Sequence, residues 1–147
     1  MTLGAQIKTL LMTKNTTPGP WLVEVESWST AMQAARLSAR TIELRAYHLC
    51  RLARAELAPT PWLLTPSDLL CWVGGHVWGR ETGRSVRSSI RRFWAWGIET
   101  GRTDCNTAGV LPIIRPALPS PRPAEASVVA QALESSDCRV NLMLRLA

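Results

Sequence analysis

Apolar residues recur at three- and four-residue spacing in four successive stretches of this 147-residue chain, and this helical period is its strongest constraint on the fold. The stripes comprise Trp21 or Leu22, with Val25, Trp28 and Met32; Ile42, Ala46, Leu49 and Ala53; Leu69, Leu70, Trp72 and Val73; and Val86, Ile90, Phe93 and Gly97, with Trp94 beside the last. No strand-like alternation of useful length interrupts them. The expected fold class is therefore all-α, a four-helix bundle with short loops.

Turn and capping residues separate these stretches. Residues 1–20 have little apolar periodicity and end in Thr-Pro-Gly-Pro, which indicates a flexible N-terminal tail and a stop before the first helix. The other boundaries are marked by Ser38 and Thr65 as N-caps, Pro66 at a first helical position and Gly101 as a C-terminal stop. The fourth helix is expected to begin near Ser85. Residues 21–109 are accordingly assigned to the bundle.

A proline-rich stretch follows the bundle. Five prolines lie between positions 112 and 123, and this density favours an extended, semi-rigid linker, assigned to residues 110–123. Residues 124–147 contain one more helical pattern, over 124–133, and a last apolar segment that Asp137 can cap. Two short helices cannot bury their apolar faces alone. Residues 124–147 are therefore expected to be the start of an incomplete second domain.

Positive charge is concentrated in the middle of the chain. The net charge is +6. Between Arg36 and Arg92 there are ten arginines and four acidic residues, whereas the rest of the chain holds seven basic and seven acidic residues. The whole excess therefore lies in the bundle, where it can attract a polyanion. An alternative explanation is that the arginines are only solvated surface residues, or that their number reflects the amino-acid composition of a GC-rich genome.

Arginines follow one face of the fourth helix. At 100° per residue, Arg80, Arg84, Arg87 and Arg91 fall within about 60° of one another, opposite the apolar stripe. The second helix carries further arginines at both ends, with Ser38 and Thr41 at its start, where amides and hydroxyls can hold phosphate. The candidate DNA-binding residues are Ser38, Arg40, Thr41, Arg45, Arg84, Arg87, Ser88 and Arg91. This pattern favours nucleic-acid binding, with an acidic protein partner as an alternative.

Catalytic, metal and cofactor sites are not indicated. The four cysteines lie far apart with no CxxC, and neither His48 nor His76 stands at ligand or nucleophile spacing. Tyr47 is the only tyrosine and sits in mid-helix, and no glycine-rich phosphate loop is present. The longest weakly charged run, residues 57–79, is interrupted by three prolines and an aspartate, so no membrane span is expected. We expect neither a metal nor a cofactor.

The order of these features resembles the four-helix core-binding domain of tyrosine recombinases, the phage-integrase family. The resemblance is carried by Ser38, Thr41, Ile42, Leu49 and Leu52; by Thr65-Pro66-Ser67-Asp68-Leu69; by Arg92-Phe93-Trp94-Ala95-Trp96 with Gly101; by Asn106-Thr107-Ala108; by Val110-Leu111-Pro112-Ile113; and by Pro121-Arg122-Pro123. Thr107 departs from the proline usual in that turn. The similarity extends over residues 23–147, and its motifs are weak individually but specific in their order.

The resemblance implies a clamp in which the core-binding domain binds one face of a core-type attachment site in double-stranded DNA. It implies that a parent recombinase breaks and rejoins DNA through a phosphotyrosine, without metal or nucleotide. The family's catalytic residues would follow residue 147, so none is assigned here, and this chain alone is expected to be inactive. Further recombinase protomers on the same DNA, and a cytoplasmic location in a bacterium or phage-infected cell, are also implied.

Two alternatives remain open at the level of sequence. A stand-alone DNA-binding regulator with a helix-turn-helix would also be basic and helical, and so would a helical module that binds an acidic protein. If the fourth helix faces DNA, Arg87→Ala and Arg91→Ala should each weaken duplex binding and flatten its salt dependence by about one unit of slope.

Overall fold

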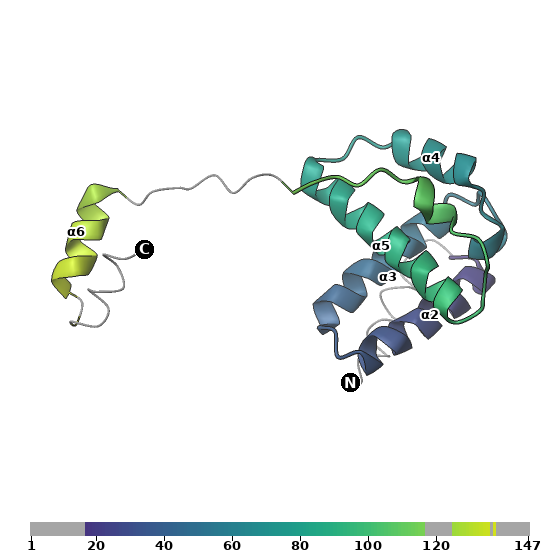
Figure 1. Ribbon diagram of the computed structural model, residues 1–147, viewed down its shortest axis with the longest axis horizontal. Coiled ribbons are helices and arrows are strands. Elements are labelled where there is room, and N and C mark those ends of the chain that lie inside the picture. Colours follow the sequence, from purple (N-terminus) through teal and green to yellow (C-terminus); the bar gives the residue numbers. More distant parts are fainter. Residues whose placement is uncertain (1–16, 117–124, 136, 138–147) are drawn as a thin grey trace. The chain divides into compact units, whose positions relative to one another are not determined.

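The computed structural model describes residues 17–116, 125–135 and 137 (Figure 1). These residues form five α-helices and two 3-10 turns and contain no strand, so the all-α prediction is confirmed. The chain divides into two compact units, one ending at Pro116 and the other beginning at Ala117. This division falls inside the stretch predicted to be a linker. No helix among the described residues is long and apolar enough to cross a membrane.

The first of the described helices, α2 (Gly19–Ala34), begins inside the segment that was predicted to be a stop. Pro20 lies in its first turn, where the missing amide proton would have no helical partner in any case, so the proline starts the helix instead of blocking it. In the predicted stripe, Val25, Trp28 and Met32 are buried, and of its two possible first residues Trp21 is buried whereas Leu22 is only partly buried. The indole Nε1 of Trp21 donates to the carbonyl oxygen of Ala58 at 3.0 Å, which ties α2 to the loop after α3.

Both predicted N-caps are confirmed. The Ser38 hydroxyl accepts a hydrogen bond from the amide of Thr41 at 3.2 Å and starts α3 (Ala39–Ala53). The Thr65 hydroxyl accepts from the amide of Asp68 at 3.2 Å and starts α4 (Pro66–Gly74), with Pro66 at the first position. The buried residues of α3 are Ile42, Ala46, His48, Leu49, Cys50, Leu52 and Ala53, and those of α4 are Leu69 and Val73.

The longest of the described helices, α5 (Arg80–Glu99), starts five residues before the position predicted near Ser85. Gly79 precedes it and no side chain caps it, whereas Glu81 in the first turn places a negative charge at the positive end of the helix dipole. The predicted stop is confirmed, because Gly101 adopts a φ of 70° in the left-handed region. The buried residues of α5 are Gly83, Val86, Ser89, Ile90, Phe93, Trp94 and Gly97.

Aromatic rings fill the space between α2, α5 and the 3-10 turn η1 (Pro61–Leu63). Trp62 stacks on Phe93, with ring centroids 5.0 Å apart and an interplanar angle of 5°. The same indole approaches Gly97 so closely that a Cβ there would lie 2.5 Å from it. Of the tryptophans placed on apolar stripes by the sequence, three are buried, and Trp72 is only partly buried against His76 and Trp78.

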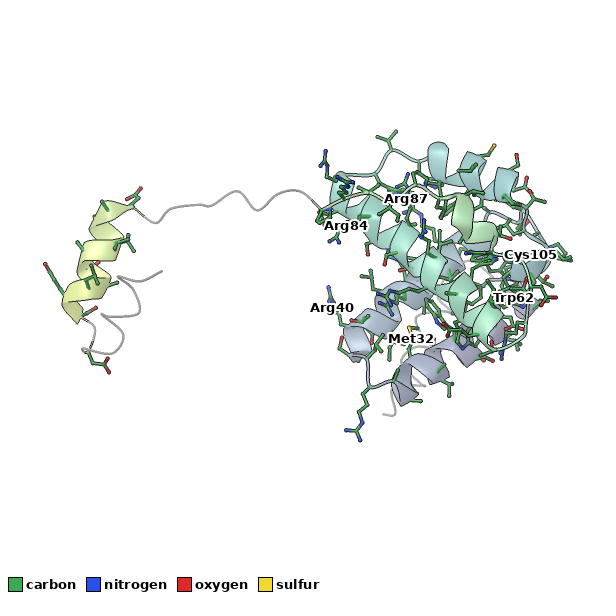
Figure 2. All side chains as sticks on the ribbon, viewed as in Figure 1. Met32, Arg40, Trp62, Arg84, Arg87 and Cys105 are labelled. Atoms are coloured by element: carbon green, nitrogen blue, oxygen red, sulfur yellow. The ribbon has the colours of Figure 1, made fainter. Side chains whose placement is uncertain are left out.

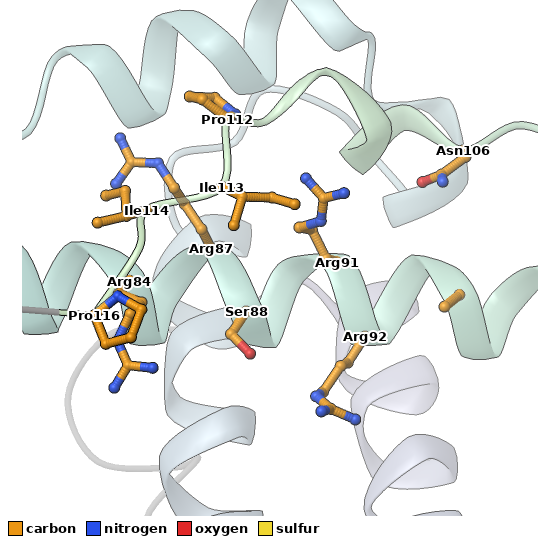
Figure 3. Close-up of a pocket in the computed structure, with 11 residues that line it drawn as sticks. Arg84, Arg87, Ser88, Arg91, Arg92, Asn106, Pro112, Ile113, Ile114 and Pro116 are labelled. Carbon is orange, nitrogen blue, oxygen red and sulfur yellow. The ribbon is translucent and has the colours of Figure 1, made fainter.

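The segment after α5 returns along the bundle. In the 3-10 turn η2 (Thr107–Val110), the hydroxyl of Thr107 donates to the carbonyl oxygen of Leu64 at 3.3 Å. This bond gives threonine a structural role that proline at the same place could not supply. Leu111 is 1% exposed and belongs to the core. Residues 111–116, which we call the strap, begin at this buried leucine and run beside α5 (Figure 3).

In the second unit, the structure describes α6 (Ala126–Ser135), close to the helix predicted over residues 124–133. None of its residues is buried. The last predicted helix, after Asp137, lies outside the described residues. The proposal that this unit begins a further domain therefore remains a prediction.

Candidate nucleic-acid interface

A groove lies between α3 and α5, and it contains most of the residues singled out by the sequence. We call it the α3–α5 groove, and its volume is about 250 Å³. It is lined by Arg40, Thr41, Leu44, Arg45, Arg84, Ser85, Ser88 and Ser89. Figure 2 shows Arg40 on α3 and Arg84 on α5 reaching toward each other across its mouth. Two helices distant in sequence thus contribute to one basic surface.

The arginine row of α5 divides into two faces. Figure 3 shows Arg87 and Arg91 directed toward the strap, whereas Ser88 and Arg92 project from the opposite side of the helix. The second side is the one that carries Arg84 and Ser88 in the α3–α5 groove. Residues four positions apart lie on one helix face, so the sequence Arg84, Ser88, Arg92 forms one row and Arg87, Arg91 forms another. The earlier start of α5 makes Arg80 its first residue, and Arg80 does not line the α3–α5 groove.

The strap closes a second hollow against α5, the strap groove, of about 550 Å³ (Figure 3). The strap contributes its apolar side and α5 contributes its charged side. The lining residues are Arg84, Arg87, Ser88, Arg91, Arg92, Ala95, Asn106, Pro112, Ile113, Ile114 and Pro116. Arg84 and Ser88 line both hollows, so the strap groove and the α3–α5 groove share part of the α5 surface.

Arg87 and Arg91 each use one nitrogen inside the protein. Nη1 of Arg87 donates to the carbonyl oxygen of Gly83 at 3.1 Å, and Nη1 of Arg91 donates to the carbonyl oxygen of Leu111. Both side chains are half-buried. A guanidinium has five N–H donors, so one internal bond leaves others for a ligand, although it restricts where the group can reach.

The other arginines of the interface are more available. Arg84 is paired with Glu81 at 2.8 Å, but both side chains are well exposed and the pair is a weak one. Within residues 17–116, no ion pair joins a carboxylate to Arg40, Arg45, Arg87, Arg91 or Arg92. The positive charge of this surface is therefore largely uncompensated, as a binding surface for a polyanion requires.

Ser38 and the arginines at the far end of α3 lie outside the groove. The Ser38 hydroxyl is engaged with Thr41, whose Oγ1 lies 2.8 Å from it, and serves the start of the helix. Arg51, near the C-terminus of α3, lies over the Trp78 ring with 5.4 Å between its guanidinium carbon and the ring centroid. Arg54 caps the end of α3. The second helix is thus divided, with its N-terminal arginines on the groove and its C-terminal arginines elsewhere.

Arg92 was missed by the sequence interpretation. It lines the strap groove and also a third hollow of about 590 Å³, the α2–α5 hollow, which it shares with Arg45. The α2–α5 hollow is lined by Trp28, Ala31, Met32, Ala35, Leu37, Arg45, Arg92, Ala95, Trp96 and Glu99. The spacing in the sequence could have identified Arg92, because it follows Ser88 by four residues and so lies on the same face of the helix. Its position next to Phe93 of the apolar stripe made it a less obvious candidate.

A buried polar pair joins the two helices beneath the groove. Nδ1 of His48 lies 2.9 Å from the hydroxyl of Ser89, which donates to the carbonyl oxygen of Ser85 at 3.0 Å. The sequence placed His48 as isolated because 41 residues separate it from its partner. Burial, and secondarily the charge of Arg51, lower the pKa of His48 below its usual value. Both side chains are buried, and the serine hydroxyl already donates to a backbone carbonyl, so we assign the pair a structural role.

The described residues contain neither a cluster of metal-ligating side chains nor a disulfide. No group of three metal-ligating side chains occurs among them. None of the three cysteines they include forms a disulfide, and burial raises the pKa of the Cys50 thiol to about 11. That thiol is therefore protonated and unreactive near neutral pH.

Comparison with known proteins gives one informative similarity. No family model matches the chain, and no curated protein matches it. Among solved structures, the integrase from mycobacterium phage Brujita is similar, with a TM-score of 0.64 and 23% sequence identity. The match covers 78% of this chain and 39% of that integrase, so the chain spans well under half of its length. At this level of identity, the comparison establishes that the two proteins share a helical fold.

Proposed function

We propose that this chain is the DNA-binding part of a site-specific tyrosine recombinase and that it binds one face of a core-type site through the α3–α5 groove. The observation that carries the proposal is the convergence of Arg40, Arg45 and Arg84 on one groove. The fold shared with a phage integrase supports the family, and it agrees with the order of motifs in the sequence.

The chemistry of the groove suits a nucleic-acid backbone. Guanidiniums bind phosphate oxygens in a two-pronged geometry, and they do so best where no carboxylate competes. The hydroxyls of Thr41 and Ser88 add donors between the arginines. An α-helix fits the major groove of B-form DNA. The longest helix of the bundle is α5, and its charged face lines both the α3–α5 groove and the strap groove, with Arg84 in each.

The proposed contacts form two groups. Those of the α3–α5 groove are Arg40, Thr41, Arg45, Arg84 and Ser88, with Ser38 holding the helix start behind them. Those of the strap groove are Arg87 and Arg91. This chain would bind DNA without cutting it, and the breaking and rejoining of DNA would belong to a catalytic domain of the parent recombinase, acting with further protomers at the crossover site.

The proposal is tested by measuring the affinity of the full chain for a labelled duplex by fluorescence anisotropy at several salt concentrations. We expect log K to fall linearly with log salt, with a slope of about −0.9 per neutralised phosphate. Arg40→Gln should weaken binding, whereas Arg54→Gln, which removes the same charge from the other end of the same helix, should not. Equal losses in the two variants would reduce the effect to net charge and refute the groove as the site.

The same measurements separate the alternatives. A footprint of two half-sites about one helical turn apart, bound by a dimer, would identify a stand-alone regulator instead. Binding to polyglutamate that equals or exceeds binding to duplex DNA would identify a module for an acidic protein. Preference for a duplex containing an attachment site over a random duplex of equal length would support the recombinase.

A further inference from the structure

Arg45 of α3 and Arg92 of α5 face the same space. Both line the α2–α5 hollow. Arg45 also lines the α3–α5 groove, and Arg92 also lines the strap groove. Between them, the two arginines therefore line all three hollows of this surface.

The two charges are close and are not neutralised by the protein. Burial, and secondarily the charge of Arg92, lower the pKa of Arg45 below its ordinary value. The one acid that lines the hollow is Glu99, two helical turns beyond Arg92, and no ion pair joins it to either arginine. The free protein thus holds two like charges together at an energetic cost.

The hydrogen bonding of Arg45 is also incomplete. Its Nη1 donates to the sulfur of Met32 at 3.7 Å, and a thioether is a weak acceptor. The side chain is half-buried against the apolar wall of the hollow. A charge in such a position is screened less by salt than a fully exposed one, so an anion held there would be bound more strongly than one on the rim.

We propose that Arg45 and Arg92 form a clamp for a single phosphate of the DNA backbone. The clamp depends on the function proposed above. It adds Arg92 to the binding surface and identifies the place where the DNA backbone would be bound most strongly. One phosphate placed between the guanidiniums would accept from both and cancel their repulsion. Because α3 and α5 each supply one half, the clamp would also fix the spacing of the two helices on DNA.

A double-mutant cycle on the full chain tests the clamp. We expect Arg45→Gln and Arg92→Gln each to lower duplex affinity about 10-fold, as for loss of one good phosphate contact. The double variant should lose about 20-fold, far less than the product of the single effects, since both act on one phosphate. Arg54→Gln is the matched control for charge. Losses that multiply, or that equal the control's, would overturn the clamp.

Thermal unfolding supplies a readout that does not involve DNA. At low ionic strength, Arg92→Gln should melt at a higher temperature than the unmodified chain, because one repelling charge is removed. Inorganic phosphate should raise the melting temperature of the unmodified chain and of Arg54→Gln more than that of Arg92→Gln. An equal response in all three would refute the clamp.

The two proposals fail in different ways. If the unmodified chain does not bind duplex DNA, the proposed function fails, while a phosphate response lost in Arg92→Gln would still support a two-arginine anion site. If the chain binds DNA and the cycle is additive, the clamp fails alone. Should Arg45→Gln not fold, Arg92→Gln carries the test, because Arg92 is exposed and its replacement leaves the core intact.

Discussion

Arg91 of α5 donates a hydrogen bond to the carbonyl oxygen of Leu111, 20 residues further along the chain, and Leu111 is itself fully buried. This contact fixes the point at which the chain leaves the bundle. A residue chosen from the sequence as a DNA contact therefore also holds the strap beside α5. The two roles can be separated by experiment.

Arg91→Met keeps most of the aliphatic stem and removes the donor. We expect the free energy of unfolding to fall by about 1–3 kcal/mol, since a buried carbonyl loses a charged partner, and the strap to become accessible to protease. Thermolysin cleavage before Ile113 or Ile114 measures the second effect. Arg92→Met, on the next residue and without a bond to the strap, should leave the cleavage rate unchanged. Equal cleavage of both variants would show that Arg91 does not anchor the strap.

Gly97 provides a test of the aromatic packing. A Cβ at this position would lie 2.5 Å from the Trp62 ring, which is stacked on Phe93. Gly97→Ala should therefore destabilise the fold by about 1–3 kcal/mol through overpacking, a fall in melting temperature of about 4–8 °C per kcal/mol. Gly74→Ala is the matched control, because no atom lies within 4 Å of its Cβ position, and it should be neutral or slightly stabilising.

The buried His48 makes stability depend on pH. Its pKa is lowered in the folded state by burial and by Arg51, so the unfolded chain takes up the proton more readily than the folded one. The stabilising effect of the neutral imidazole is fully present above the unfolded pKa of about 6.5, and it is lost as the pH falls below that value toward the folded pKa.

Melting temperatures measured from about pH 8 to about pH 5 test this expectation. The unmodified chain should lose stability below about pH 6.5, and His48→Gln should start lower but vary less over the same range. Ser89→Ala should lower stability at every pH, because the Nδ1 of His48 loses its partner. A His48→Gln variant that retains the full acid-induced decline would assign the decline to another group.

The fold was largely predictable because its signals are local. Apolar period and capping residues identified α2 to α5, and the Ser38 and Thr65 caps lie where expected. The early starts of α2 and α5 were not predicted, since a proline can start a helix as well as prevent one, and no side chain caps α5.

The candidate site was predictable in composition but not in arrangement. A helical wheel placed Arg84, Arg87 and Arg91 on one face, because it treats α5 as an isolated cylinder. In the fold, the strap packs beside one side of that face and α3 beside the other. The arginines therefore line two different grooves, and Arg92, which the wheel did not include, lines one of them. The His48 and Ser89 pair depends on a contact between distant helices, which no spacing within one segment can reveal.

Glu81 gives the last prediction, because its carboxylate lies 2.8 Å from Arg84 at the edge of the α3–α5 groove. Glu81→Gln removes a charge that opposes DNA and frees Arg84, so duplex affinity should rise by about 2- to 10-fold while the salt slope steepens.

Arg84→Gln should flatten the salt slope of duplex binding by about one unit. Arg87→Ala and Arg91→Ala should flatten it by a smaller amount, since each of their guanidiniums already has an internal bond. Salt titrations of the four variants measure this order. A weaker Glu81→Gln complex would mean that DNA does not approach Arg84, and the α3–α5 groove would then lose its claim to be the binding surface.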